Sequence, residues 1–494
     1  MKKLFKIVPK IASKPYGMSR LISSVLVGTS LVLQSGWTLP GIAQTDSYCR
    51  LTSAAISEKE TLRRAAFGGN EGSKTRYQEL VRQHAQILQQ CRSRTWPQTQ
   101  AIWLRLYPCD TKSGVLESVL DHVVNKGYNQ IHVEVFFNSQ VLLPENDNPT
   151  PWSSVVRSQG AENVDLLAQA IAKGHERGLK VYAWAFTMNF GYNYGLLPDR
   201  QSAIARNGKG QNSLDYVSDG AQLFIDPYHP QAQRDFNQLT NAIARRRPDG
   251  VLFDYIRYPR GSGAASVAAN VKDLWIYGSA AQQSLIQRGL NRQGSELIQI
   301  YLQRGTITAE DVAAVRDRYP NESTPNWQGR NTSASSVEAL RSQLWTLSVA
   351  HAAQGVIDFL NLAARPVQSN GIPAGAVFFP TANIGVGQQG YDSRLQPWDR
   401  FSPTLEWHPM AYAVCGSPNC IVDEVRRVVN LASPQTKVMP ALAGYWGRRD
   451  DNRPSLESQM QAIRQAVPQI KAVSHFAYSW QEPQSDRARR FCEL

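Results

Sequence analysis

The sequence predicts an α/β fold: a closed (β/α)₈ TIM barrel with an N-terminal helical hairpin and a helical insertion after strand 4. From Thr99 onward, eight apolar runs alternate with amphipathic helical stretches, which is the element order of such a barrel. The predicted strands are residues 101–107, 130–137, 180–187, 250–255, 374–379, 405–410, 437–442 and 472–478. The main alternative is a doubly wound open sheet. It is disfavoured because Tyr107 and Pro108 follow the first strand where such folds carry a glycine-rich phosphate turn.

Residues 1–43 have the layout of a secretory signal peptide. Basic residues without any acid precede an apolar stretch at 21–33, and small residues at 41–43 offer a cleavage site. The alternative is an uncleaved membrane anchor, but the stretch is short for the roughly 20 residues that a span needs. We expect a secreted, periplasmic or cell-envelope protein with no transmembrane segment after cleavage.

The charge of the chain favours acidic surroundings only mildly. The formal net charge is +13, and removal of the six basic residues of the predicted signal leaves +7. An excess of this size suits cell-wall polymers and is weak evidence for nucleic acid, so no nucleic-acid partner is expected.

Six cysteines follow the predicted signal. An even number in an exported protein indicates disulfide bonds, and their spacing does not match a zinc site, so no metal is assigned to them. Several pairings are possible. The preferred set is Cys49 with Cys91, Cys109 with Cys492, and Cys415 with Cys420.

Three regions follow the signal: an N-terminal helical region at 44–98, the barrel at 99–494, and an insertion at 260–336 within the barrel. In the first region, Ser57 and Glu60 predict a capping box, and the glycine-rich residues 68–72 separate two helices. In the insertion, residues 273–302 predict a helix. Because the insertion follows a barrel strand, we expect it on the catalytic face.

The residues at the ends of the predicted strands are rich in carboxylates and aromatic rings. In residues 250–259, an apolar strand ends on Asp254, Arg257 and Tyr258. Such a mixture suits a sugar, because rings stack on its apolar face and two carboxylates can cleave a glycosidic bond. The candidate catalytic residues are Asp254, Glu482, Glu134 and Asp226. The candidate substrate-binding residues are Arg105, Asn138, Trp184, Asn189, Arg257, Tyr258, His408, Tyr412, Tyr445, Trp446 and Trp480.

Several of these residues have a structural interpretation as well. Glu134 can pair with Arg105 inside the barrel, and Asp226 can cap a helix over 230–245. His408 can be a core histidine, and Glu482 a solvated carboxylate. A metal-dependent hydrolase would need clustered histidines and acids, whereas His132, His229 and His408 are scattered, so neither a metal nor a cofactor is expected.

The residues from Phe253 to Pro259 resemble the signature of glycosyl-hydrolase-like family 10. Similarity extends to residues 223–227 and 409–412. The resemblance implies a (β/α)₈ barrel that hydrolyses glycosidic bonds, with some relatives linked to bacterial cell-wall glycans or exopolysaccharides. The chain departs from the pattern at Tyr255, where the family commonly has a second aspartate, and at Glu134 and Phe136, where an amide and an arginine are usual.

Together these observations predict an exported glycosidase that cleaves a cell-wall or extracellular polysaccharide with two carboxylates. Asp254 is one of them, and Glu482, Glu134 or Asp226 supplies the other. The alternative is a catalytically inactive, glycan-binding envelope protein on the same barrel.

Overall fold

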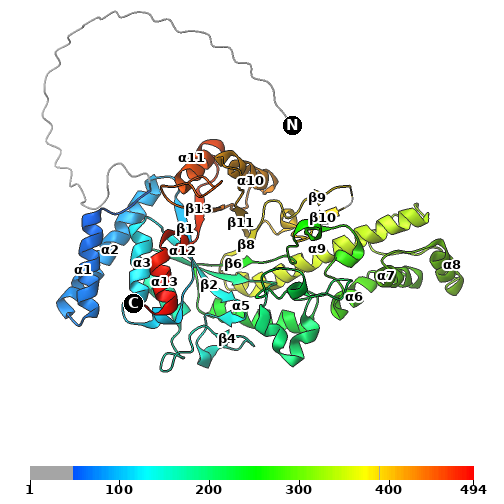
Figure 1. Cartoon of the computed structure of the whole chain (residues 1–494), viewed down its shortest axis with the longest axis horizontal. Helices are drawn as coiled ribbons and strands as arrows, with labels where there is room; N and C mark the ends of the chain where they lie inside the picture. The colour runs from blue at the N-terminus through cyan, green and yellow to red at the C-terminus, as the bar shows by residue number, and fades with distance from the viewer. Residues whose placement is uncertain (1–47, 389, 494) are drawn as a thin grey trace, which may run out of the picture. The chain divides into compact units, whose positions relative to one another are not determined.

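The predicted (β/α)₈ barrel is confirmed. The structure is a computed structural model that describes residues 48–388 and 390–493. Eight parallel strands form the barrel (Figure 1), and β1 closes it by pairing with both β2 and β13. In barrel order they are β1 (Thr99–Leu104), β2 (Gln130–Phe137), β5 (Lys180–Phe186), β6 (Gly250–Asp254), β8 (Ala374–Phe378), β11 (Glu406–Ala411), β12 (Ala441–Ala443) and β13 (Ala472–Phe476).

The seventh strand is shorter than the sequence predicts. The prediction begins at residue 437, whereas β12 begins at Ala441 and Val438 forms only an isolated bridge with Trp407. Pro440 explains the difference, because it has no amide hydrogen to donate to a neighbouring strand.

Amphipathic helices surround most of the barrel. Each buries an apolar face against it, as α3 does with Leu116, Val119, Leu120 and Val123. The helices that follow barrel strands are α3 (Val115–Asn125), α4 (Leu166–Glu176), α5 (Pro230–Arg245), α9 (Val337–Ser369), α10 (Pro418–Leu431), α11 (Leu456–Ala466), α12 (Tyr478–Gln481) and α13 (Pro483–Phe491). Between β8 and β11 the described residues contain no α-helix. Instead, β9 (Gly385–Val386) and β10 (Gly390–Asp392) pair with each other, and β10 also pairs with β7 (Val267–Ala268).

The N-terminal hairpin consists of α1 (Ser53–Phe67) and α2 (Glu71–Arg94), which lie against α3 and α4. The predicted capping box at Ser57 and Glu60 is wrong. Helix α1 begins a turn earlier, because the side chain of Thr52 accepts a hydrogen bond from the amide of Ala55. Glu60 pairs with Arg63 and Arg64 instead.

A buried polar network joins the hairpin to α3 and the end of α4. The Asp121 carboxylate accepts hydrogen bonds from Tyr77 Oη at 2.7 Å and from Arg177 Nε at 2.9 Å. Arg177 also donates to Tyr77 Oη, and Lys59 Nζ lies 3.8 Å from Asp121. Burial lowers the pKa of Lys59 to about 8, against the attraction of Asp121.

The insertion is helical, but its first helix is not continuous as predicted. Residues 273–302 contain two helices, α6 (Ser279–Ile286) and α7 (Arg292–Arg304). The chain breaks between them because Gly289 packs closely on Ser295 and Asn291 caps α7 by accepting from Gly294 N. Helix α8 (Ala309–Arg318) follows, and α7 and α8 lie near the end of α9 that is furthest from the barrel (Figure 1).

Three disulfide bonds join Cys49 to Cys91, Cys109 to Cys492, and Cys415 to Cys420, the pairs named above. The second connects the turn after β1 to the end of α13. The predicted signal peptide lies outside the described residues. Within the described part of the chain, no helix has the length and apolar character needed to cross a bilayer.

Candidate active site

A cavity of about 300 Å³ lies at the carboxyl ends of the barrel strands. Its wall is mainly aromatic, and its charged residues are Asp254, Arg105 and Arg257. Most of the lining residues are the last residue of a strand or follow it closely, which is where barrel enzymes place their reactive groups. The aromatic lining residues are Trp103, Phe137, Trp184, Phe186, Tyr255, Phe379, Tyr412 and Phe476.

Asp254 is the last residue of β6 and faces this cavity. Asp254 is only 6% exposed. The carboxylate accepts hydrogen bonds from Tyr255 N at 2.6 Å and from Trp184 Nε1 at 3.1 Å. Burial raises the pKa of Asp254 to about 6, although both hydrogen bonds and the charge of Arg257 favour the ionised form. Asp254 can therefore carry a proton near pH 6, unlike an ordinary aspartate.

Tyr255 occupies the position where the family commonly has a second aspartate. Its φ of 52° is in the left-handed region, and this turn brings its amide to the Asp254 carboxylate. Its ring stacks on Phe186 at 4.1 Å between centroids and lies 4.5 Å from the Arg257 guanidinium. The substitution thus adds a wall to the cavity and removes a charge.

Glu134 is the nearest candidate for a second carboxylate. It lies beside an irregularity in β2, between Glu134 and Phe136, and hydrogen-bonds Arg105 through both carboxylate oxygens. Burial and the negative charge of Asp254 raise the pKa of Glu134, while Arg105 opposes the rise. The charge of Asp254 therefore acts on Glu134. Glu134 itself does not line the cavity, but its partner Arg105 does, and the Arg105 guanidinium lies over the Phe137 ring.

Arg257 lines the cavity without a carboxylate partner. It is 6% exposed, and its Nη1 donates to the backbone oxygen of Tyr258 at 2.9 Å. Within residues 48–388 and 390–493, no carboxylate oxygen lies within ion-pair distance of its guanidinium. Burial lowers the pKa of Arg257.

Two predicted catalytic residues lie outside the cavity. Asp226 is fully buried and accepts hydrogen bonds from the amides of Tyr228 and Ala281, so it joins the insertion to the barrel; His229 caps α5 instead. Glu482 is ion-paired with Lys126 at the end of α3. Neither carboxylate lines the site.

The predicted substrate-binding residues divide into three groups. Arg105, Trp184, Arg257 and Tyr412 line the cavity. Tyr445 and Trp480 form a stacked pair beside it, with centroids 5.5 Å apart and Trp480 6.3 Å from Phe476.

The remaining five make structural contacts. His408 lies inside the barrel beside Glu406, where burial lowers its pKa. Asn189 accepts from the amides of Gly191 and Leu223, and Tyr258 is fully buried. Trp446 donates to Tyr128 Oη and packs on Tyr48. Asn138 follows β2 in a left-handed conformation and does not line the cavity.

The sequence analysis missed much of the apolar lining. Trp103, Phe137, Phe186, Tyr255, Val377, Phe379, Met410 and Phe476 were not among the candidates. Phe137, Phe186 and Phe476 each end a strand. Their position at predicted strand ends is a signal that could have identified them, but only polar residues and selected aromatic residues at those ends were taken as candidates.

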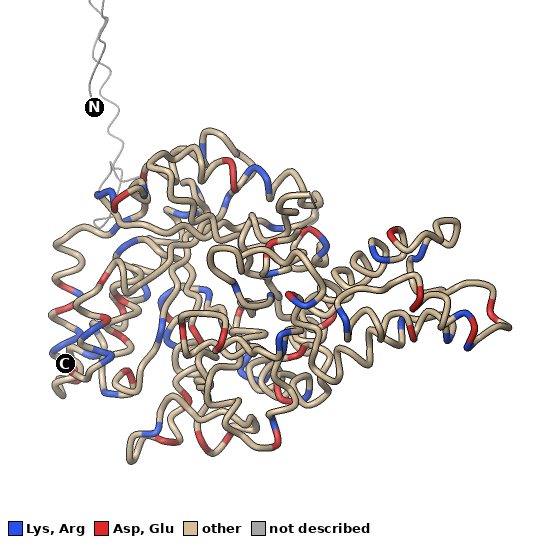
Figure 2. The backbone as a smooth tube through the Cα atoms, turned by 45° about the vertical axis from the view of Figure 1, so that its right-hand side comes forward, with Lys and Arg blue, Asp and Glu red and all other residues tan. Residues whose placement is uncertain are grey.

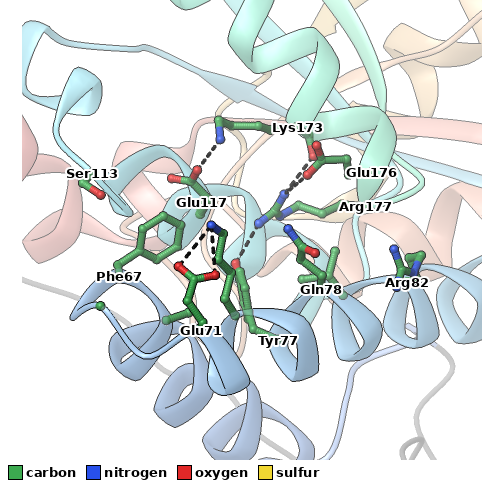
Figure 3. A pocket seen from close by; sticks show the side chains of 14 residues that line it. Phe67, Glu71, Tyr77, Gln78, Arg82, Ser113, Glu117, Lys173, Glu176 and Arg177 are labelled. Atoms are coloured by element: carbon green, nitrogen blue, oxygen red, sulfur yellow. Dashed lines mark hydrogen bonds and ion pairs between the residues drawn. The ribbon is translucent and has the colours of Figure 1, made fainter.

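A second cavity, of about 630 Å³, lies between the N-terminal hairpin and helices α3 and α4 (Figure 3). Most of its ionic side chains pair with one another, and Arg82 is the exception among the described residues. Lys173 pairs with Glu117, Arg177 bonds Tyr77, and Glu71 lies 3.5 Å from Lys74. It is larger than the barrel-mouth cavity, but all its charged groups except Arg82 already have partners. Among the described residues, no group of three or more histidine, cysteine, aspartate or glutamate side chains is arranged to hold a metal ion.

The closed (β/α)₈ barrel has a buried aspartate in an aromatic cavity at the carboxyl ends of its strands, an arrangement that suits the binding of a sugar. Residues 103–277 match the family model described as Glycosyl hydrolase-like 10, and the resemblance carried by residues 253–259 is thus confirmed. A search of curated protein sequences finds no match.

Solved structures of similar fold include glycoside hydrolases of low sequence identity. The PgaB (BpsB) glycoside hydrolase domain from Bordetella bronchiseptica is 14% identical, with 79% of this chain and 98% of that chain covered and a TM-score of 0.46. A GH18 chitinase from Pseudoalteromonas aurantia is 11% identical, with 77% and 94% covered and a TM-score of 0.35. A GH20 exo-β-N-acetylglucosaminidase from Vibrio harveyi is 9% identical, with 80% and 53% covered and a TM-score of 0.40.

Proposed function

We propose that this protein is an exported glycoside hydrolase that cleaves a cell-wall or extracellular polysaccharide, with Asp254 and Glu134 as its two carboxylates. One observation carries the proposal. Asp254 is buried at a strand end, faces an aromatic cavity and has a pKa raised to about 6. Aromatic walls suit sugar rings, and a carboxyl group with a raised pKa suits proton donation to a glycosidic oxygen.

In this proposal Asp254 is the general acid. It protonates the departing glycosidic oxygen as the bond to the anomeric carbon breaks. Glu134 is the second carboxylate, and Arg105 holds it and favours its ionised form. Because Glu134 lies behind Arg105, it acts as a general base through a water molecule and does not attack the anomeric carbon itself. Glu134 is preferred to Asp226 and Glu482 because it bonds Arg105, which lines the cavity, and is acted on by the charge of Asp254. Asp226 and Glu482 bond residues that do not line the cavity.

Export is part of the same proposal. The basic and apolar pattern of residues 1–43 supports a signal peptide, and three disulfide bonds suit an oxidising compartment. Expression of the full chain with N-terminal sequencing of the exported product tests it, and an unprocessed product would count against it.

A glycan-binding protein without catalysis is the second candidate. The observation in its favour is that Asp254 is the one acidic residue lining the cavity within the described part of the chain, because Glu134 lies behind Arg105. Such a protein would bind polysaccharide without releasing new ends.

The test is to incubate the exported protein with purified cell-wall and extracellular polysaccharides and to measure new reducing ends. Asp254→Asn should lower the rate by about 100-fold or more, the range for a lost general acid. Glu482→Gln is the matched control, because it also removes a carboxylate but outside the cavity. Binding without new ends would favour the second candidate, and full activity of Asp254→Asn would remove Asp254 from the mechanism.

A further inference from the structure

The arginines around the barrel-mouth cavity differ in their partners. Arg105 hydrogen-bonds both oxygens of Glu134. Arg394 bonds both oxygens of Asp392 at 2.7 Å and is only 4% exposed. Arg257 is as deeply buried, yet it has no such carboxylate among the described residues, and its only hydrogen bond there goes to the backbone oxygen of Tyr258. Most of its donors are therefore left for a ligand in the cavity.

The charges at the cavity do not balance when Asp254 carries its proton. Arg105 and Glu134 neutralise each other, so Arg257 leaves an excess positive charge in a confined aromatic site. A buried charge is costly without an opposite partner. A ligand that brings one negative charge would supply this partner and bond the planar guanidinium with two oxygens.

The surface beside the cavity also combines aromatic rings with cationic side chains. Phe476, which lines the cavity, contacts Trp480, and Trp480 stacks on Tyr445. The guanidinium of Arg448 lies 4.1 Å from the Tyr445 ring, and that of Arg453 lies 5.7 Å from the Trp480 ring. The same loop carries Asp450 and Asp451, but within the described residues neither forms an ion pair with these arginines. Rings flanked by cations suit a chain of acidic sugars.

We propose that the cavity takes an acidic polysaccharide whose sugar units carry a carboxylate, and that Arg257 binds this carboxylate. The inference rests on the proposed function, since it assumes that the cavity is the glycan site. A carboxylate is favoured over a phosphate because one unpaired guanidinium matches one negative charge, whereas a phosphate monoester carries about −1.5 to −2. Acidic and basic residues are interspersed over the fold (Figure 2), so the preference should come from this site and not from the overall charge.

The test measures binding by calorimetry to the Asp254→Asn protein, which removes turnover. The probes are polygalacturonate, alginate, hyaluronan and peptidoglycan glycan strands, each compared with the same polymer after chemical reduction of its carboxylates to alcohols. At least one native polymer should bind about tenfold or more tightly than its reduced form, as expected for a lost charge-assisted pair. Adding Arg257→Gln should abolish this difference, and Arg257→Lys should keep part of it. Arg341→Gln is the matched control, because Arg341 in α9 also donates to a backbone oxygen, that of Ile307, and does not line the cavity.

Equal binding of native and reduced polymers would overturn the inference, and so would discrimination that survives Arg257→Gln. Tighter binding of a polymer with phosphate monoesters, or of a teichoic acid, whose phosphodiesters carry one negative charge each, than of every carboxylated polymer would overturn the choice of carboxylate. If Arg257→Gln fails to fold, the comparison of native and reduced polymers on Asp254→Asn alone still decides.

The outcomes separate the two proposals. Carboxylate-dependent binding without cleavage by the unmodified protein would uphold the inference and reject the hydrolase. Cleavage of neutral polymers with no effect of carboxylates would uphold the hydrolase and reject the inference. Failure to bind any polymer would reject both.

Discussion

The hairpin interface and the barrel mouth both bury charged side chains, but at the interface these side chains have oppositely charged partners, whereas two of those at the mouth form no ion pair among the described residues. At the interface, Asp121 is surrounded by Tyr77, Arg177 and Lys59, so its negative charge is met by two cations and a hydroxyl. At the mouth, the described residues give Asp254 two hydrogen bonds, one from a backbone amide and one from an indole. Arg257 is paired with no acid in the described residues.

The difference teaches that burial of charge does not by itself mark a functional site. A closed network fixes how two parts of a protein pack. Charges left open toward a cavity keep their binding capacity for a ligand. The larger cavity, beside the hairpin, is of the first kind, and the smaller one at the strand ends is of the second. Each of the following experiments breaks or sharpens this contrast.

The largest expected effect is on the pH dependence of cleavage. If Asp254 is the general acid, only its protonated form is active, and kcat/KM should fall as pH rises above about 6. Half of Asp254 is protonated at pH 6 and about one hundredth at pH 8, so the fall is about 50-fold over this range and approaches tenfold per pH unit at its upper end. Rate measurements on soluble oligosaccharides over this range check it. A rate that rises through pH 6 would instead make Asp254 the base or nucleophile.

The next effect is on stability, at the hairpin interface. Asp121→Ala leaves Arg177 and Lys59 buried without their counter-charge, so the free energy of unfolding should fall by about 3 to 5 kcal/mol. Urea unfolding followed by circular dichroism measures this. Glu117→Ala is a matched control, because Glu117 pairs with the partly exposed Lys173 and should lose less. Equal losses would mean that the network is not the stronger contact.

Asp254→Asn should raise the free energy of unfolding, in contrast to the loss expected for Asp121→Ala. The folded pKa of about 6 exceeds the ordinary 3.8, so ionisation of Asp254 destabilises the fold increasingly between these values and fully above pH 6. At pH 7.5 the neutral amide should raise the free energy of unfolding by up to about 3 kcal/mol, by the conversion of 1.36 kcal/mol per pKa unit. The gain should vanish near pH 3.8. A constant gain across pH would point to packing rather than charge.

The barrel was predictable because its signal is distributed over many residues. A wrong boundary does not change the number or order of the eight apolar runs. In β12, Pro440 moves the start of the strand but the strand is still present. Local caps were less predictable, since Thr52 and Ser57 both offer a hydroxyl near the start of α1. In the structure Thr52 is the cap, next to Leu51, whose amide bonds the backbone oxygen of Asn125.

The candidate site was predictable within a strand and at its end, and less so further along the chain. Asp254, Arg105 and Trp184 could be placed at the mouth because strand direction fixes their position, whereas Arg257 lies three residues beyond β6 and still lines the cavity. Glu482 and Trp446 follow strands by only a few residues, but the chain turns outward there to Lys126 and Tyr128. Sequence spacing contains no information about that turn.

The smallest effect is expected for Glu482, a carboxylate that lies outside the cavity. Glu482→Gln removes a partly exposed ion pair with Lys126, and such pairs contribute about 0 to 1 kcal/mol. Its stability and cleavage rate should therefore stay close to those of the unmodified protein, as judged by urea unfolding and reducing-end release. Lys126→Gln should behave alike, because it breaks the same pair from the other side. A large loss of activity in Glu482→Gln alone would return Glu482 to the mechanism and would require the end of β13 to face the cavity when substrate is bound.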